Sequence, residues 1–552
     1  MRSHSSFRLS LVGAALGLLV GDVFAADVTA PTFLTPFPQL LRNNVRWVPQ
    51  AARVRVFTDE PTQIWLEFDD GSGAVRRELA DAEYTTDHRR VPVVGMKHEQ
   101  TTDIRVIARD EAGNETVFPT ALTFPARPLP ADFPPLEIRH VDQAMMEPGY
   151  TLFATRGNLQ GTFTNWVIAL DGDGDVVWYY RRPGAGGVNI EQMRNGNLLW
   201  SRARHTLEMD ILGKVQNKWY PARHDAGANA DPGSILVDTD SFHHEMREMP
   251  EGEEADFLCL SSELRVFDDY PVDVIDTSIT MDGVNVVGDV IVEFKRDGTI
   301  VREVKLLDIL DPYRMCYDSD GPFWNNSIYG DVTPGLQTQD WSHANAVIID
   351  PTDGNYIVSA RHQDALVKID RETQELIWIH GDPSRWNAPW SQYLLTPTGG
   401  LHLWQFHQHA PEINADGNMV LFDNGNWRAI PPTTPDALEQ TFSRAIEYRI
   451  DPVNMTSQQV WWYGSRLVGS ENHMFSRFIC DADPLPVTDN ILVTNGGIFE
   501  IGVPVNHVQL LELTRTRPPV KVFEATIKDE AEQQSWTVYR SERIPSLYNA
   551  GS

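Results

Sequence analysis

Three histidines precede glycine-containing turns at similar spacings in widely separated parts of the chain. The pairs and their spacings are His409 and Gly417 (eight residues), His244 and Gly252 (eight residues), and His343 and Gly354 (eleven residues). An imidazole ring can act as a nucleophile, a general base or a metal ligand. Because packing gives no reason for one residue type to recur at matching positions of a repeat, we interpret the three histidines as parts of one functional site.

An arginine and a further histidine, Arg361 and His362, follow the apolar strand pattern that comes after His343. The forked guanidinium group binds tetrahedral oxyanions well. It offers no ligand to a metal and repels a cation, which argues against the alternative of a three-histidine zinc site. We therefore predict a site for an oxyanion, without a metal or cofactor.

The chain lacks the sequence motifs of several other classes of enzyme. The chain contains no glycine-rich phosphate loop, serine nucleophile elbow or CxxC pair. Its three cysteines are far apart, which allows one disulfide in an oxidising compartment but predicts neither a disulfide framework nor a zinc knuckle. They are Cys259, Cys316 and Cys480.

The charge balance limits the partners of the protein. Its 552 residues include 77 acidic and 46 basic side chains, for a formal net charge of -31. Such a surface repels phosphate backbones and anionic head groups, so we expect neither nucleic acid nor a membrane as a partner. An anionic substrate would need local positive charge, which Arg361 supplies.

The first 25 residues have the pattern of a signal peptide. Arg2 and Arg8 form a basic start, residues 9–20 are apolar, and residues 23–25 predict cleavage after Ala25. No later run approaches the roughly 18 apolar residues that a membrane span needs. We therefore expect a mature protein that is exported, either to the periplasm or out of the cell.

Residues 26–128 predict a small β domain. Polar and apolar residues alternate in 52–57, 63–68 and 103–108, which is the pattern of half-buried antiparallel strands. A β-sandwich of the fibronectin type III kind is the natural interpretation. A proline-rich linker at 129–137 follows and marks the domain boundary.

Residues 138–552 repeat one pattern, in which a glycine- or asparagine-containing turn is followed by an apolar strand. Such repeats of strand groups at roughly 40 to 60 residues are typical of a β-propeller. Six turns predict six blades, and the inserts at 264–290 and 311–340 are expected to form loops on one face. The turns lie in 171–180, 194–200, 353–359, 415–421 and 487–493 and at Glu251-Gly252.

A propeller explains why residues far apart in the chain could meet. The innermost strand of each blade lines the central channel, and the residues just before it converge around the axis. We expect His244, His343 and His409 to converge in this way. Arg361 and His362, placed after the inner strand of the His343 blade, would bring a cation to the same channel.

The motifs around these residues resemble those of the bacterial arylsulfate sulfotransferases, and the similarity covers nearly the whole mature chain. The motifs are 242–244, 340–346, 359–363, 408–409 with 422–425, 91–96 in the first domain, and 539–548 at the end. The resemblance implies an exported enzyme with a fibronectin-like N-terminal domain and a six-bladed propeller. It also implies ping-pong transfer of a sulfuryl group from an aryl sulfate to a phenol, and it suggests a homodimer.

The resemblance also implies a role for each matching residue. His409 falls on the nucleophile, which would become a sulfohistidine, while His244, His343 and Arg361 fall on residues that bind the sulfuryl oxygens. A protonated His343 or His244 would supply the proton of the leaving group. Further residues expected at the substrate are His243, His407, His362, Asn345 and Trp404, the last with Trp386 and Trp390 as candidates either to stack on an aryl ring or to pack in the core.

Two other classes of function remain open at this stage. The chain could be another propeller enzyme, such as a quinone- or metal-dependent oxidoreductase or a lyase with histidines in its channel. It could also be a propeller that binds a ligand without catalysis. Turnover of an aryl sulfate separates these alternatives from sulfuryl transfer.

Overall fold

The computed structural model describes residues 27–548 except 74, 126, 182–186, 203–204, 326–327 and 330–336. The predicted signal peptide lies outside the described residues. Strands dominate, and the α-helices of the described part are two short ones, α1 (His224–Ala228) and α2 (Leu306–Ile309). None of these helices has the length and apolar character that crossing a membrane requires.

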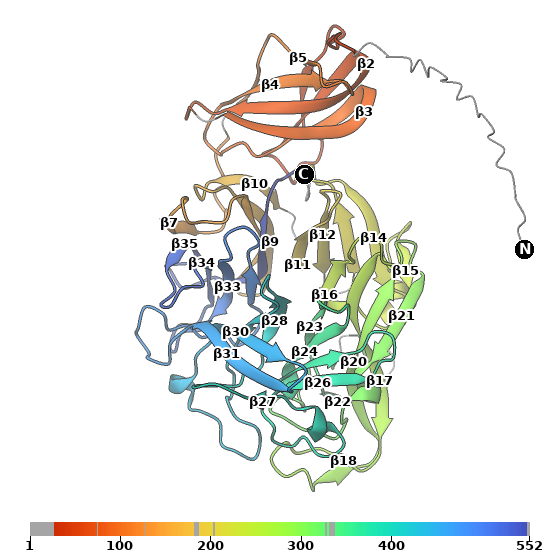
Figure 1. Cartoon of the computed structure of the whole chain (residues 1–552), viewed down its shortest axis with the longest axis vertical. Helices are drawn as coiled ribbons and strands as arrows, with labels where there is room; N and C mark the ends of the chain where they lie inside the picture. Colours follow the sequence, from red (N-terminus) through yellow and green to blue (C-terminus); the bar gives the residue numbers. More distant parts are fainter. Residues whose placement is uncertain are drawn as a thin grey trace, which may run out of the picture.

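The N-terminal region forms one sheet of six strands, shown at the top of Figure 1. Buried residues alternate in both halves of β2, as the sequence predicted, but the expected strands at 52–57 and 63–68 are two parts of this one long strand. The sheet order is β1-β2-β4-β5, with β3 on β2 and β6 on β4. The strands are β1 (Gln39–Arg42), β2 (Ala52–Asp69), β3 (Val75–Val93), β4 (Thr102–Arg109), β5 (Glu115–Val117) and β6 (Leu122–Phe124).

The rest of the described chain forms six further sheets of four or more strands and a two-stranded sheet of β18 (Tyr270–Pro271) and β19 (Thr280–Met281). The first has the order β36 (Ser535–Ile544), β8 (Tyr150–Leu159), β9 (Thr162–Leu170), β10 (Val176–Arg181). The second is β11 (Gly187–Gln192), β12 (Leu198–Arg202), β13 (His205–Met209), β14 (Val215–Pro221), β15 (Ile235–Val237). The third is β16 (His243–Glu248), β17 (Phe257–Phe267), β20 (Val284–Phe294), β21 (Ile300–Lys305), with β22 (Thr338–Asp340) on β20.

The remaining three sheets follow the same plan. The fourth is β23 (Ala344–Ile349), β24 (Tyr356–Ala360), β25 (Ala365–Ile369), β26 (Leu376–Gly381). The fifth is β28 (His409–Ile413), β29 (Met419–Asp423), β30 (Arg444–Asp451), β31 (Thr456–Tyr463), β27 (Thr396–Pro397). The sixth is β32 (Asp481–Pro484), β33 (Ile491–Ile498), β34 (His507–Leu513), β35 (Lys521–Ile527), β7 (Leu136–Val141).

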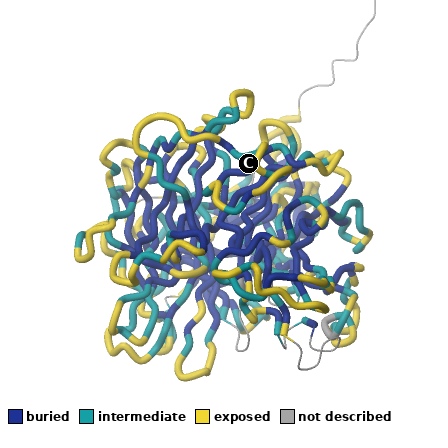
Figure 2. Tube along the Cα trace, turned by 90° about the horizontal axis from the view of Figure 1, so that it is seen from below, coloured by how far each residue is buried: buried dark blue, intermediate teal, exposed yellow. Residues whose placement is uncertain are grey.

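The first strands of the six sheets contact one another in a closed ring, in the order β36, β11, β16, β23, β28, β32 and back to β36. Both ends of this region take part in the closure, because the late strand β36 completes the first sheet and the early strand β7 completes the sixth. Figure 2 shows buried strands in the interior and exposed loops at the periphery. We call this arrangement the six-sheet ring.

One hydrophobic core joins the N-terminal sheet to the first two sheets of the ring. It includes Val48 and Val94 from the N-terminal region together with Trp178 and Trp200 from the ring. Near the chain end, the Tyr548 hydroxyl lies 3.0 Å from the backbone N of Val94 and accepts its hydrogen bond. Two of the motifs that carried the family resemblance, 91–96 and 539–548, are therefore in direct contact.

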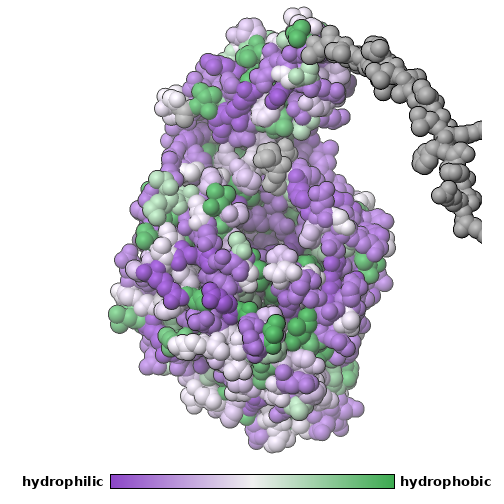
Figure 3. Space-filling view, in the orientation of Figure 1, coloured by the Kyte–Doolittle hydropathy of each residue, from purple (hydrophilic) through white to green (hydrophobic). Residues whose placement is uncertain are grey.

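A lysine reinforces the same junction. Lys97 Nζ lies 2.6 Å from Asp173 and 2.9 Å from Asp175, and Asp171 is at 3.4 Å. The three carboxylates of this aspartate-rich turn therefore surround an ammonium group. Figure 3 shows the smaller N-terminal lobe above the larger body, with hydrophilic side chains over most of this face.

Two details of the ring differ from the sequence-based prediction, and a third answers a question about the cysteines that the sequence left open. The turn at 171–175 joins β9 to β10, whereas the other five turns join the first strand of a sheet to the second. The insert at 264–290 is only partly a loop, because β17 and β20 remain paired up to Phe267 and Val284. The three cysteines are buried and free, without a disulfide.

Candidate functional site

A cavity of about 880 Å³ opens where β16, β23 and β28 begin, and six of the nine predicted site residues lie on its wall. We call it the histidine cavity. The predicted residues on its wall are His243, His244, His343, Arg361, His362 and His409. The structure thus brings together side chains from the third, fourth and fifth sheets.

Local distortions of the inner strands present these histidines to the cavity. His244 and His343 have positive φ angles of 52° and 42°. The pairing of the first and second strands shifts register near the start of β16, β23 and β28. A left-handed backbone at a residue other than glycine costs on the order of 1 kcal/mol and persists only where the surrounding structure imposes it, commonly at functional sites.

Asn424 determines the tautomer of His409. The Asn424 Nδ2 amide donates hydrogen bonds to the backbone oxygens of Ser476 at 2.9 Å and Ile479 at 3.0 Å. Its Oδ1 must therefore be the acceptor toward His409 Nδ1, which lies 2.7 Å away. The proton of His409 is held on Nδ1, and Nε2 keeps a free lone pair.

The surroundings of His409 also keep its ring uncharged. The side chain is only 2% exposed. Burial, and then the charge of Arg361, lower the pKa of His409 well below 6.5. A neutral imidazole with a free Nε2 is the form that acts as a nucleophile.

Two stacked histidines, His343 and His362, form the neighbouring part of the wall. Their ring centroids are 4.5 Å apart. His343 Nδ1 donates to Asp340 Oδ2 at 2.6 Å, and His362 Nδ1 donates to the Asp340 backbone oxygen at 2.8 Å. Burial lowers the pKa of His343 well below its ordinary value, and Arg361 adds to this effect.

Arg361 lies in the 3-10 turn η2 (Arg361–Gln363), which follows β24. It therefore follows the second strand of its sheet rather than the inner strand, which corrects the sequence-based expectation. Its Nη1 donates to His362 Nε2 at 2.6 Å and its Nη2 to the Arg477 backbone oxygen at 3.1 Å. The buried Nε has no hydrogen-bond partner in the described structure, which leaves a donor available to a ligand.

His243 and His244 form a hydrogen-bonded pair. Their Nδ1 atoms are 2.9 Å apart, and His243 Nε2 donates to the Ser261 backbone oxygen at 2.9 Å, with Asp289 Oδ1 at 3.2 Å. The ring of His244 lies 4.8 Å from that of His343. Both members of the pair line the cavity, but His244 is the one whose ring contacts the other central histidine.

The other three predicted residues lie away from the cavity wall. His407 is fully buried between two carboxylates, with Nδ1 2.8 Å from Asp364 and Nε2 3.2 Å from Asp318. Burial opposes protonation of this ring, but the carboxylates of Asp364 and Asp318 prevail and raise its pKa. Asn345 Nδ2 donates to the Gln408 backbone oxygen at 2.8 Å. Trp404 packs in a cluster with Cys316, Phe406 and Ile430.

The apolar part of the cavity comes from residues that the sequence did not single out. Phe323 lies with its ring 4.7 Å from that of His343, and the ring of Tyr539 is 6.3 Å from those of both His244 and His409. Trp386, in contrast, is buried in the core under Arg314. The newly identified wall residues include Phe242, Phe323, Trp324, Phe478, Ile479, Tyr539 and Arg156.

One signal in the sequence pointed to part of this wall. The insert at 311–340 supplies Phe323, Trp324 and Ile328, together with Asp318 and Asp340. Tyr539 belongs to a motif of the family resemblance, although the sequence assigned it no role. Arg156 and Phe478 had no recognisable signal.

The donor atoms near the cavity do not favour a metal. Asp340, His343 and His362 are close enough together to share an ion, as are Asp318, His362 and His407. His362, which belongs to both groups, already accepts a hydrogen bond from the cationic Arg361. A guanidinium in contact with a ligand would repel a metal ion.

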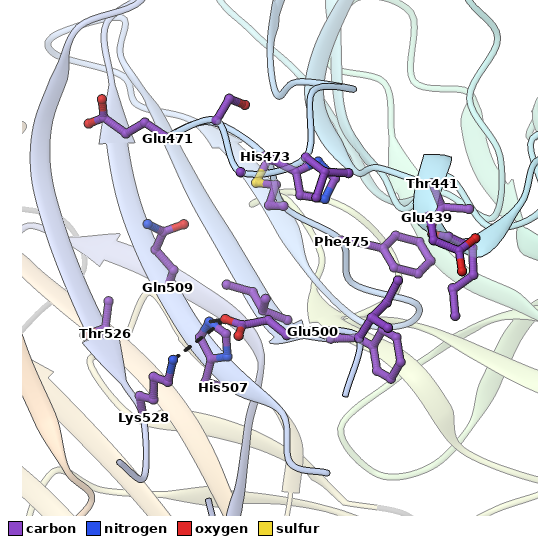
Figure 4. A pocket seen from close by; sticks show the side chains of 18 of the residues that line it. Glu439, Thr441, Glu471, His473, Phe475, Glu500, His507, Gln509, Thr526 and Lys528 are labelled. Atoms are coloured by element: carbon purple, nitrogen blue, oxygen red, sulfur yellow. Dashed lines mark hydrogen bonds and ion pairs between the residues drawn. The ribbon is translucent and has the colours of Figure 1, made fainter. Parts of the chain in front are cut away.

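A second cavity of about 460 Å³ lies beside the sixth sheet (Figure 4). Within this cavity Glu500 lies 3.4 Å from His507 and 3.7 Å from Lys528. It brings together none of the nine predicted residues. The histidine cavity is therefore the better candidate for a functional site.

The chain is similar to proteins of one known family. A family model for arylsulfotransferase (ASST) matches residues 137–540. Arylsulfate sulfotransferase AssT from Escherichia coli O6:H1 is 29% identical over 300 residues, which cover 47% of this chain and 48% of that protein. Arylsulfate sulfotransferase AssT from Lelliottia amnigena is 26% identical over 295 residues, or 47% of each chain.

The matched segment thus spans about half the length of these curated relatives. Among solved structures, a protein of unknown function from Bacteroides caccae has a TM-score of 0.29 and 13% identity, with 73% of this chain and 93% of that chain covered. That likeness is too low to support an argument. The family match covers most of the six-sheet ring and every residue on its histidine cavity, and the chain belongs to the arylsulfotransferase (ASST) family.

Proposed function

We propose that the protein is an arylsulfate sulfotransferase that moves a sulfuryl group from an aryl sulfate to a phenol through a sulfohistidine at His409. The observation that carries the proposal is the free Nε2 of His409, fixed by Asn424, in a cavity that also contains Arg361. A neutral imidazole nucleophile beside a fixed cation suits attack on the sulfur of a sulfate ester.

In the first half-reaction, the lone pair of His409 Nε2 attacks the sulfur. The N–S bond forms as the S–O bond to the aryl group breaks, and the bond electrons leave with the phenolate. The sulfuryl-imidazole ring gains positive charge, which the hydrogen bond from Nδ1 to Asn424 Oδ1 stabilises. In the second half-reaction a phenol attacks the same sulfur, and His409 is released unchanged.

Arg361, His244 and His343 would stabilise the sulfuryl oxygens. The unpaired Arg361 Nε can donate directly to an oxygen. A bound sulfate brings negative charge next to the two imidazoles. Their pKa values are therefore higher with sulfate bound than in the empty site, and the protonated forms are favoured. Either ring could then protonate the departing phenolate and later take a proton from the attacking phenol.

The three residues away from the wall fit supporting roles in this proposal. Asn345 and Ser359 both donate to the backbone oxygen of Gln408, directly before the nucleophile. The backbone N of His407 donates to Asp364 Oδ1 at 2.8 Å. These bonds hold the segment that presents His409, so we assign Asn345 and His407 to positioning and Trp404 to packing.

The proposal extends to the architecture and the location of the protein. We interpret the six-sheet ring as a six-bladed β-propeller, because its inner strands close on themselves and its terminal strands complete two sheets. The N-terminal sheet would correspond to the fibronectin-like domain, with 129–137 as the linker. The pattern of residues 1–25 supports export to the periplasm or beyond.

Release of nitrophenol from nitrophenyl sulfate, with and without an added phenol, tests the function. The proposal predicts that sustained release requires the phenol and that initial rates show ping-pong kinetics. His409→Ala should abolish release, whereas His140→Ala, at an exposed position on β7, should not alter it. Release that is independent of the phenol, or that survives in His409→Ala, would contradict the proposal; uptake of the ester without turnover would indicate a binding protein.

A further inference from the structure

Arg156, on β8, is a second guanidinium on the wall of the histidine cavity. It stacks on the ring of Phe163, with its guanidinium carbon 3.8 Å from the ring centroid. The residue is exposed, and its partial desolvation lowers the pKa of the guanidinium without an offset from a neighbouring carboxylate. Arg156 is therefore a cation that the described part of the chain does not neutralise.

Some arginines of the described structure pair with carboxylates, whereas Arg314 and Arg385 donate to backbone oxygens instead. Arg247 lies 2.7 Å from Glu412, and Arg296 lies 2.7 Å from Glu208. With 77 acidic and 46 basic residues, the chain has carboxylates in excess. Arg156 lies on a cavity wall and forms no ion pair in the described structure, so an anionic group of a ligand can supply the opposite charge there.

The carboxylates of the cavity have partners of their own. Asp340 accepts hydrogen bonds from His343 and from Trp324 Nε1. Asp318 pairs with His407 and accepts a hydrogen bond from Trp427 Nε1. Their charges are therefore partly compensated where they stand, and neither forms an ion pair with Arg156.

The pairing of β8 with β36 places Arg156 near Tyr539, whose ring lies beside the central histidines. In the first sheet Arg156 pairs with Thr537 of β36, and Tyr539 lies two residues farther along that strand. Two residues correspond to about 7 Å of strand. Because the ring of Tyr539 lies 6.3 Å from those of His244 and His409, a benzene ring with groups at both ends could reach the histidines and Arg156 together.

We infer that the preferred substrates are aryl sulfates or phenols with a second anionic group, such as a carboxylate, at the end of the ring away from the transferred sulfuryl group, and that Arg156 binds this group. This inference rests on the proposed function and names its substrate class. Phe323 and Phe478 would flank the ring, since both lie on the same wall. The contact between Arg156 and this anionic group exists both in the bound substrate and in the transition state. It should therefore lower KM more than it raises kcat.

Two substrates that differ in one charge test the inference. The rates with 4-carboxyphenyl sulfate and with its neutral methyl ester would be measured with one phenol acceptor, in the unaltered protein, Arg156→Gln and Arg156→Lys. We expect Arg156→Gln to lower the ratio of the two kcat/KM values about 10-fold or more, mainly through KM, as for a lost charge-assisted hydrogen bond. Arg156→Lys should retain part of the preference.

Arg449→Gln is the matched control, because Arg449 is exposed on β30 and lies outside the cavity. It should leave the ratio unchanged. An unchanged ratio in Arg156→Gln would overturn the inference while the proposed function stands. Failure of the unaltered protein to turn over either ester would instead overturn the proposed function, and the inference with it.

Discussion

The side-chain amide of Asn424 fixes the tautomer of His409 on the wall of the histidine cavity. Two backbone carbonyls orient the amide, and its oxygen then accepts a hydrogen bond from the protonated Nδ1 of the imidazole. The chemistry of His409 therefore depends on a neighbour that need not touch the substrate. This relationship can be tested through the pH dependence of the reaction.

Asn424→Asp should move the acid limb of the kcat/KM profile to higher pH. The carboxylate can accept the same hydrogen bond, but its negative charge favours protonated His409 and so raises the pKa that burial and Arg361 lower. Since only neutral His409 attacks, activity would be lost at a higher pH as the solution is acidified. Asn454→Asp, at an exposed turn position, should leave the profile in place, and an unmoved profile in Asn424→Asp would count against the role of Asn424.

Arg361→Gln should reduce kcat/KM by an amount equivalent to about 2 to 4 kcal/mol of transition-state stabilisation, as for removal of one oxyanion donor. The reason is that Arg361 offers a positive charge and an Nε–H donor without a hydrogen-bond partner in the described structure, which can bind a sulfuryl oxygen. Steady-state kinetics with nitrophenyl sulfate would measure the loss. Kinetics equal to those of the unaltered protein would remove Arg361 from the mechanism.

Glu191→Gln should stabilise the protein increasingly as pH rises from 4.5 to about 7. Burial raises the pKa of Glu191 to about 7, with Arg247 opposing and Glu245 adding to the shift. The folded state therefore binds more protons than the unfolded state in this range, and stability declines with rising pH. The glutamine variant lacks this decline.

Denaturant unfolding at several pH values would measure the difference between the two proteins. We expect it to grow by roughly 2 to 3 kcal/mol between pH 4.5 and 7 and to be constant above. Glu251→Gln, in an exposed turn, serves as the control. A pH-independent difference for Glu191→Gln would show that the pKa of Glu191 is not raised in the folded protein.

The meeting of the histidines could be anticipated from the sequence because it depends on short-range regularity. His244 and His409 stand near the first residue of β16 and β28, and the same short strand and tight turn separate each from its glycine. The equal spacing of His244 and His409 from their turn glycines thus reflects their similar positions at the start of the inner strands. His343 lies one residue before β23, which accounts for part of its longer spacing.

Other features depend on contacts that leave no local pattern. The pairing of β36 with β8 joins residues almost 400 positions apart, and no turn between the two strands announces it. The exposed Phe323 lies in an insert without a repeat, so its edge-to-face contact with His343 follows only from the folded loop. Arg156 could not be found either, because an arginine without a partner looks in sequence like any other.

The sulfohistidine is the central claim, and it can be observed directly. The protein would be mixed with nitrophenyl sulfate in the absence of a phenol, quenched at alkaline pH, digested and analysed by mass spectrometry. The account predicts one added sulfuryl group on the peptide that contains His409, which disappears when a phenol is added before quenching. A sulfuryl group on another residue, or turnover in the presence of a phenol without any modified peptide, would contradict it.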